Sequence, residues 1–328
     1  YGLGPETPVG QPKNKHMELG PRDRLSQAFW QEQQKGRVIQ GPMGDVVHLD
    51  LRHLGEKYLK ERLPFICELA KAYVGVDPVK EPIPVRPTAH YTMGGIETDG
   101  KCATRLAGLY AAGECASVGL HGANRLGSNS LSEIVVFGKV AGEQAAEFAA
   151  TQQHGNTQAL VAKAEALIKQ HLSLLDIDGT ENPADIRNEL GMSMEAGVGI
   201  YRTEELMQGT IDKINELKAR YKKIKINDKS SVFNTDLLYA IELGYMLDVA
   251  EAMAHSAINR KESRGSHQRL DGYEERDDVN FLKHTLSFYN GEGAPTIDYS
   301  DVKITKSQPA KRVYGSEGEK QDEAKKNG

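Results

Sequence analysis

The chain has 328 residues, a hydrophobic content of 39% and a mean hydropathy of -0.52, which is typical of a soluble protein that buries more than one core. Its formal net charge of -5 argues against nucleic acid as a partner, because phosphate binding needs an excess of Lys and Arg. No apolar run approaches the ~20 residues of a membrane span, and the dispersed Cys67, Cys102 and Cys115 support neither a metal site nor a disulfide framework.

Residues 1–87 have an irregular, loop-rich pattern. The first residues, 'YGLGPETPVG', contain no Met, so we expect the N-terminus to be a cut rather than a start. The segment ends in 'VDPVKEPIPVRPT', whose prolines hold the preceding residues in extended geometry. This composition favours a crossing between two domains.

Short apolar segments separated by glycines follow from residue 88 to about 150. 'GLYAAGE' predicts a short buried strand over 109–112, a tight turn at Gly113 and Glu114 at its tip. Glu114 could accept hydrogen bonds from the hydroxyls of a cofactor, and a simple surface turn fits the heptapeptide equally well. His90, before the glycine pair of 'HYTMGG', is by itself more typical of a structural histidine.

'HGANRLGSNSLSEIVVFG' predicts the start of a helix that could hold an anion. 'SLSE' has the spacing of a capping box, with Ser130 at the N-cap and Glu133 at N3. A helix N-terminus behind glycine-rich turns offers free N–H groups to an anion or an electron-rich ring edge. His121 and Arg125 lie just outside and could hold a carboxylate or phosphate. Taken alone, the box would only start a helix and Arg125 would be a surface charge.

Helical spacing of apolar residues marks residues 151 to about 263. Two stripes carry this prediction: Leu160, Ala164, Leu167, Ile168 and Leu172, and then Leu238, Ile241, Met246 and Met253. The last residues are polar, with 'DYSDVKITK' as a possible strand and 'GEKQDEAKKNG' as a frayed tail.

The segments 'RPTAHYTMGGIETD', 'GLYAAGECASVGLHGANRLGSNSL' and 'ESRGSHQRLD' together resemble the flavoprotein subunits of the succinate dehydrogenase and fumarate reductase family. The resemblance covers practically the whole chain. 'GSNSLSE' and 'GGIETD' are more similar to bacterial quinol:fumarate reductase than to succinate dehydrogenase, and L-aspartate oxidase matches less well.

The resemblance implies a fold class and a division into domains. We expect an α/β FAD-binding domain remnant, part of an α+β capping domain, an α-helical domain and a mostly irregular C-terminal extension. The corresponding ranges are the remainder of the capping domain at 1–87, the second part of the FAD-binding domain at 88–150, the helical domain at 151–268 and the extension at 269–328.

The resemblance also implies roles for particular residues. Ser130 and Leu131, at the helix N-terminus, would face the flavin's pyrimidine edge, and Glu114 would bind the ribityl hydroxyls of FAD. His90 and Arg125 would hold the dicarboxylate, fumarate or succinate, over flavin N5. Arg22, in 'GPRDRLSQAF', would donate the proton to fumarate while hydride passes from N5. Without the resemblance, Arg22 would be interpreted as a surface salt-bridge arginine.

The chain also departs from the family pattern. It has no G-x-G-x-x-G turn for the ADP half of FAD, and the histidine that attaches FAD covalently is absent. We therefore expect the C-terminal half or somewhat more of a flavoprotein subunit, inactive when alone.

Two functions of different class follow from these observations. The first is a fumarate reductase flavoprotein subunit seen in part, or alternatively a succinate dehydrogenase one. It would work with an iron–sulfur subunit and membrane anchor subunits at the cytoplasmic face of the bacterial inner membrane, peripheral through those partners. The second is a cofactor-free fragment that acts only as a scaffold or interaction module.

Overall fold

The structure is a computed structural model that describes residues 20–41, 44–153, 155–291, 293–306 and 308–310. The described residues form two compact units, and the boundary between them lies between His90 and Tyr91. The first unit contains the elements up to His90, and the second extends from Tyr91 to Lys306. The predicted C-terminal tail and the first nineteen residues lie outside the described ranges.

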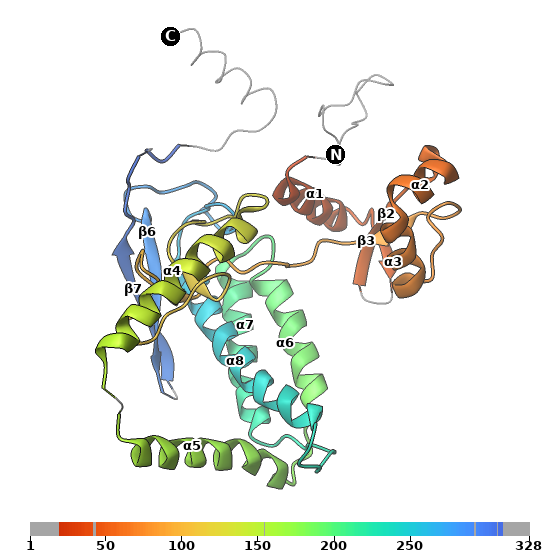
Figure 1. The fold of residues 1–328 in the computed structure, drawn as a ribbon. Coiled ribbons are helices and arrows are strands. Elements are labelled where there is room, and N and C mark those ends of the chain that lie inside the picture. The colour runs from red at the N-terminus through yellow and green to blue at the C-terminus, as the bar shows by residue number, and fades with distance from the viewer. Residues whose placement is uncertain (1–19, 42–43, 154, 292, 307, 311–328) are drawn as a thin grey trace. The chain divides into compact units, whose positions relative to one another are not determined.

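The first unit is a small α+β structure built on a three-stranded antiparallel sheet of order β1-β2-β3 (Figure 1). Its buried apolar side chains include Phe29, Leu59, Cys67, Ala70, Pro78 and Ile83. The elements in chain order are α1 Arg22–Gln34, β1 Ile39–Gly41, β2 Gly44–Leu49, the 3-10 turn η2 Arg52–Leu54, α2 Glu56–Arg62, α3 Pro64–Val74 and β3 Ile83–Val85.

The prediction of an irregular segment over 1–87 is therefore wrong for the described residues from 20 onward. The strands, of three to six residues, have too few positions to show an alternating pattern, and α1 buries only Phe29 and so shows no apolar stripe. The sheet also depends on a distant pairing, in which Val47 lies opposite Val85. One proline of this segment, Pro64, is the first residue of a helix, α3, where its fixed backbone angle is favourable.

The glycine-rich segment opens the second unit and contains little regular structure. Two short strands, β4 Ile96–Glu97 and β5 Ala116–Ser117, pair in parallel. The strand predicted over 109–112 is wrong. Tyr110 makes only an isolated bridge to Ala103, and Leu109 is exposed. The long helix α4 Asn129–Thr151 follows.

The helical part confirms the expected helices over the region from 151 to 263. It comprises α5 Thr157–Leu172, the 3-10 turn η3 Ser173–Asp176, α6 Pro183–Gly197, α7 Glu204–Tyr221 and α8 Thr235–Asn259. Helices α6, α7 and α8 pack together around the largest apolar core, whose fully buried members include Ile186, Met207, Ile214, Leu217, Leu243 and Leu247 (Figure 1).

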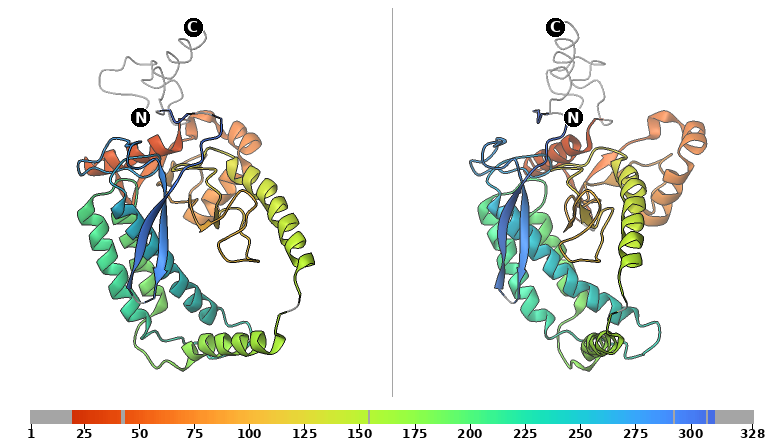
Figure 2. Two further views of the ribbon diagram at one scale, coloured as in Figure 1. Left: turned by 90° about the vertical axis from the view of Figure 1, so that its left-hand side faces the viewer. Right: turned by 60° about the vertical axis from the view of Figure 1, so that its left-hand side comes forward.

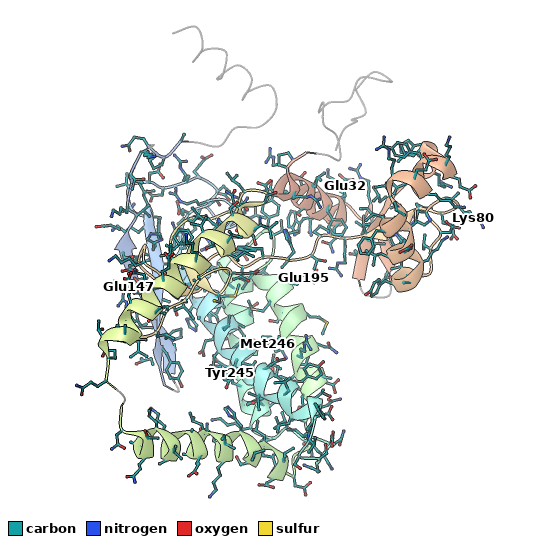
Figure 3. The ribbon with its side chains drawn as sticks, in the orientation of Figure 1. Glu32, Lys80, Glu147, Glu195, Tyr245 and Met246 are labelled. Carbon is teal, nitrogen blue, oxygen red and sulfur yellow. The ribbon has the colours of Figure 1, made fainter. Side chains whose placement is uncertain are left out.

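The apolar stripes that predicted two of these helices are not their buried faces. None of the α5 residues is buried, and Leu238, Met246 and Met253 of α8 are exposed. Tyr245 and Met246, labelled on α8 in Figure 3, are both exposed. α8 instead buries Leu243 and Leu247 together with Ala240, Ala250, Ala254 and Ala257. Small side chains on that face allow close helix approach, which a search for large apolar residues overlooks.

A β-hairpin closes the second unit and lies against α8 (Figure 2). It consists of β6 Lys283–Asn290 and β7 Gly293–Asp301, which pair antiparallel. The predicted strand 'DYSDVKITK' overlaps only the end of β7, and the expectation of a mostly irregular extension misses this hairpin. Among the helices of the described ranges, none is both long enough and apolar enough to cross a membrane.

Candidate functional site

The six predicted site residues lie in both units. Arg22 is the first residue of α1 and is exposed, and His90, also exposed, is the last residue of the first unit. Arg125, Glu114, Ser130 and Leu131 belong to the second unit. Within that unit the structure brings Glu114, Arg125 and the start of α4 into one polar neighbourhood around Tyr91 and Thr92, the two residues that follow His90.

A buried carboxylate forms the centre of this neighbourhood. Glu133 of α4 is 2% exposed, and its Oε2 accepts a hydrogen bond from the Tyr91 hydroxyl at 2.8 Å. The same oxygen lies 2.7 Å from Nε2 of His121, whose side chain is 8% exposed. Burial and the Glu133 hydrogen bond raise the pKa of Tyr91 to about 12, so Tyr91 remains a hydroxyl donor at neutral pH.

Arg125 lies over the ring of Tyr91, with the guanidinium carbon 4.3 Å from the ring centre. This cation–π contact orients the side chain, and Nη1 donates to the Leu126 carbonyl at 3.1 Å. Nε of Arg125 is buried and has no hydrogen-bond partner among the described residues, and the same is true of Nδ1 of His121. An unpaired guanidinium donor in a partly buried site fits a carboxylate ligand.

The start of α4 differs from the predicted capping box. The helix begins at Asn129 behind Ser128, which has a φ of 66° and makes no side-chain cap. Ser130 is therefore inside the helix. Glu133 is too far along to bond back to the first residue, and it binds Tyr91 and His121 instead. The capping-box prediction is wrong, although the predicted helix is present.

The helix N-terminus nevertheless keeps free donors. The Ser130 N–H makes no hydrogen bond within the described residues, and Leu131 is 65% exposed. The aligned peptide dipoles add positive potential at this end. An electron-rich group fits this position, as the sequence predicts.

Glu114 lies at the tip of the expected tight turn. Gly113 has a φ of 82°, and the turn closes when Ala116 N–H donates to the Gly113 carbonyl at 2.9 Å. A Cβ at Gly113 would lie 3.0 Å from a methyl group of Ile134, so glycine brings the turn close to α4. Oε1 of Glu114 accepts from Thr92 N–H at 2.9 Å, and Oε2 has no partner among the described residues. One oxygen therefore remains to accept from a ligand hydroxyl.

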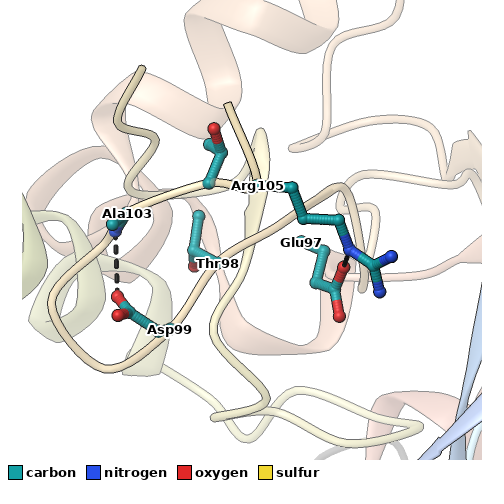
Figure 4. A pocket seen from close by; sticks show the side chains of 6 residues that line it. Glu97, Thr98, Asp99, Ala103 and Arg105 are labelled. Carbon is teal, nitrogen blue, oxygen red and sulfur yellow. Dashed lines mark hydrogen bonds and ion pairs between the residues drawn. The ribbon is translucent and has the colours of Figure 1, made fainter. Parts of the chain in front are cut away.

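A pocket of about 360 Å³ in the second unit contains none of these residues. It is lined by Glu97, Thr98, Asp99, Ala103, Thr104 and Arg105 (Figure 4). Its charged groups already have partners in the loop, because Arg105 pairs with Glu97 and Asp99 accepts from the amides of Lys101 and Ala103. Across the described ranges, His, Cys, Asp and Glu nowhere gather in a group of three that could hold a metal ion.

Sequence reasoning missed Tyr91 and gave Glu133 the wrong partner. Tyr91 orients Arg125 and binds Glu133, and its only sequence signal was its place beside His90 in 'HYTMGG'. The pairing of Glu133 with His121 spans twelve residues and had no local signal.

Two family models match the chain. One is described as a FAD binding domain and matches residues 9–131, and the other is described as the C-terminal part of the fumarate reductase flavoprotein and matches residues 187–314. The first range contains all six predicted site residues. The second contains most of the helical core and the β6–β7 hairpin.

Curated relatives match over nearly the full chain. A fumarate reductase flavoprotein subunit from a Serratia species is 70% identical over 99% of this chain and 55% of its own length. A succinate dehydrogenase flavoprotein subunit from Rickettsia bellii is 41% identical over 90% of this chain and 52% of its own length. The chain thus spans about half the length of the curated relatives it matches.

A solved structure agrees with these relatives. A quinol fumarate reductase variant from E. coli superimposes with a TM-score of 0.88 at 69% identity, over 96% of this chain and 54% of the solved chain. The helices and strands described above are therefore similar to those in the corresponding half of that protein.

Proposed function

The chain belongs to the family of succinate dehydrogenase and fumarate reductase flavoprotein subunits, and on that premise we propose that it carries the substrate-binding half of a fumarate reductase flavoprotein subunit. The observation that carries the proposal is Arg125, which is oriented over Tyr91 and has a buried, unpaired Nε. The higher identity to a relative named fumarate reductase than to one named succinate dehydrogenase favours fumarate reduction.

The described residues fit FAD as the cofactor. The unpaired Ser130 N–H at the start of α4, with Leu131 beside it, would meet the flavin ring, and the uncommitted oxygen of Glu114 would accept from ribityl hydroxyls. When bound, FAD supplies the hydride for the reaction. The helix dipole at Ser130 favours the negative charge of the reduced cofactor.

The chain's own residues would bind the substrate and deliver the proton. Fumarate becomes succinate when one alkene carbon gains a hydride and the other gains a proton. Arg125 and His90 would hold the carboxylates, Arg125 through paired N–H donors that match a carboxylate. Arg22 would give a guanidinium proton to the second alkene carbon. Because arginine stays protonated in proteins, a relay must return that proton at once.

Assembly and domain organisation are parts of the same proposal. One matched structure is a quinol fumarate reductase solved with menaquinol molecules, and another is an Sdh1 complex from Mycobacterium smegmatis. By analogy, this chain would work with an iron–sulfur subunit and membrane anchors, at the cytoplasmic face of the bacterial inner membrane. Residues 1–87 would then belong to a capping domain, 88–150 to the FAD domain, 151–268 to a helical domain and 269–328 to an extension.

Two arginine substitutions in a complete subunit that contains this chain test the proposal. Arg22→Gln should reduce kcat by about 10² to 10⁴ and leave KM for fumarate within several-fold, because it removes the proton donor alone. Arg125→Lys should raise KM and also lower kcat, with a combined loss of roughly 1–3 kcal/mol in transition-state stabilisation.

Arg24→Gln, on the same helix as Arg22, is the matched control and should keep its turnover. If Arg22→Gln retained most of its turnover, or lost activity only through weaker fumarate binding, Arg22 would not be the proton donor. If Arg125→Lys left KM unchanged, Arg125 would not bind the substrate. A preparation that oxidises succinate much faster than it reduces fumarate would favour succinate dehydrogenase.

A further inference from the structure

A tight turn after α8 touches the loop that carries Arg125. Arg264 N–H donates to the His267 carbonyl at 2.8 Å, and His267 N–H donates back to the Arg264 carbonyl at 3.0 Å. Gly265 and Ser266 are therefore the two central residues. Gly265 has a φ of 60°, which matches the first central position of a type II′ turn, where glycine is preferred.

The tip of this turn contacts a single acceptor, the carbonyl oxygen of Ala123. Ser266 donates to it twice, from its backbone N–H at 2.9 Å and from its Oγ at 2.8 Å. A Cβ on Gly265 would lie 2.5 Å from that oxygen and 2.6 Å from its carbon, so only glycine permits the approach. The contact joins residues 143 positions apart, and Ala123 lies two residues before Arg125.

Buried side chains at both ends of the Arg264–His267 turn hold it in place. Glu262 is fully buried and accepts from Nε and Nη2 of Arg264 at 2.8 and 2.9 Å. His267 Nδ1 lies 2.9 Å from Nη1 of Arg202, and its Nε2 lies 2.9 Å from the Arg260 carbonyl. Because a guanidinium only donates, Nδ1 accepts and Nε2 carries the proton. The imidazole is thus neutral and fixed in one tautomer.

The Arg125 loop has few anchors of its own. Leu120 and Leu126 at its two ends are exposed, and Gly122 has open space around it. Its other ties are the His121–Glu133 pair, the stacking of Arg125 on Tyr91 and local bonds to the Leu126 carbonyl. The local Asn129–Leu126 backbone bond joins the loop only to the start of α4, so the turn after α8 supplies a backbone anchor from a distant segment, two residues before Arg125.

We propose that Gly265 and Ser266 are positioning residues for Arg125, and that their contact with Ala123 holds the guanidinium where a dicarboxylate binds. The proposal rests on the proposed function of Arg125. A displaced arginine loses its paired geometry toward a carboxylate, so the defect should appear in dicarboxylate affinity rather than in flavin content.

The test uses a complete subunit with FAD, and isothermal titration calorimetry with malonate as the dicarboxylate. Gly265→Ala should raise the malonate Kd and the fumarate KM by about 10-fold or more, because its Cβ displaces Ala123. Gly272→Ala is the matched control, since Gly272 also has positive φ but has open space at its Cβ. Its Kd should stay within about two-fold of the wild type, with unchanged flavin absorbance in both variants.

Two variants of Ser266 keep the test decisive if Gly265→Ala fails to fold. Ser266→Ala removes the Oγ bond and should raise the malonate Kd by about 3- to 10-fold, whereas Ser266→Thr keeps a hydroxyl and should restore it to within about two-fold. If Ser266→Ala and any folded Gly265→Ala bind malonate like the wild type while Arg125→Lys does not, the positioning proposal fails alone. If Arg125→Lys also binds normally, the proposed function fails with it.

Discussion

The α6–α8 bundle and the polar loop region of the second unit, which we define as residues 91–133 and 260–271, place their side chains in opposite ways. In the bundle, buried positions are apolar except for Thr210, and Ile214, Leu217, Leu243 and Leu247 have almost no exposed surface. In the polar loop region the buried positions include Glu133, Glu262, His267 and Arg269, while Leu106, Leu126 and Leu131 are each more than 60% exposed.

This difference separates two physical tasks. The bundle is stabilised by apolar burial, which needs no specific partner. The polar loop region has buried charges that require correctly placed donors and acceptors. It exposes apolar groups and leaves two donors without partners among the described residues, the buried Nε of Arg125 and the Ser130 N–H. Its order depends on specific hydrogen bonds and charge pairs, such as those of Glu133 and Glu262.

Truncation of a buried leucine in the bundle should lower the free energy of unfolding far more than truncation of an exposed leucine in the polar loop region. Leu247→Ala in α8 should lower the free energy of unfolding by about 2–5 kcal/mol, because it opens a cavity in a packed core. Leu131→Ala in α4 should change it by about 0.5 kcal/mol or less, since Leu131 is already exposed. Urea unfolding followed by circular dichroism measures both, and equal losses would remove the distinction between the two regions.

A smaller effect should appear as a pH dependence that the apolar bundle cannot provide. Burial, followed by the charge of Arg202, lowers the pKa of His267 from 6.5 to about 4. Between these values the unfolded chain binds a proton that the folded chain does not. Stability should therefore fall as pH decreases from 6.5 toward 4, by about 1–3 kcal/mol from this residue.

Urea midpoints measured from pH 7 to pH 4 test this assignment. His267→Gln should flatten the slope in that window, even if its stability at pH 7 is lower because two hydrogen bonds change. His53→Gln in the exposed turn η2 is the control and should keep the wild-type slope. An unaltered slope in His267→Gln would mean that other groups cause the pH dependence.

The smallest expected effect concerns the buried carboxylate beside Arg125. Glu133→Gln keeps the shape but removes the charge that Tyr91 and His121 bind, and it should reduce the free energy of unfolding by about 1 kcal/mol. Glu143→Gln on the same helix loses only an exposed pair with Lys139 at 3.7 Å and should change it by less than about 0.5 kcal/mol. Indistinguishable urea midpoints would show that the Glu133 charge is not stabilising.

The sequence was most informative where the signal is local. The helices after residue 151, the turn at Gly113 and the helix after 'GSNSL' were all predicted correctly, because helical period and glycine preferences depend on neighbours in the chain. In the first unit, an α+β domain is implied only by the family resemblance, and the residue pattern does not predict its strands. These strands are short, and β2 pairs with β3 across about forty positions, as Val47 and Val85 do.

The residues of the proposed site were named from the motifs, but their surroundings were not. Arg125 was identified from 'HGANR', whereas its contact with the Tyr91 ring had no sequence signal. The sequence 'SLSE' has the pattern of a capping box, but Ser130 is not the N-cap, since α4 begins at Asn129. Glu133 was free to bind His121 only because the helix starts earlier than the box requires.

Local sequence patterns predict the helices of the second unit and supply the residue types that could meet a carboxylate and a flavin. The packing of distant segments sets which face of α8 is buried, which partner Glu133 has and which turn supports Ala123. The physical reason is the range of the interactions. Backbone preferences act over a few residues, whereas the loop that carries Arg125 is held at Ala123 by Ser266, 143 positions away.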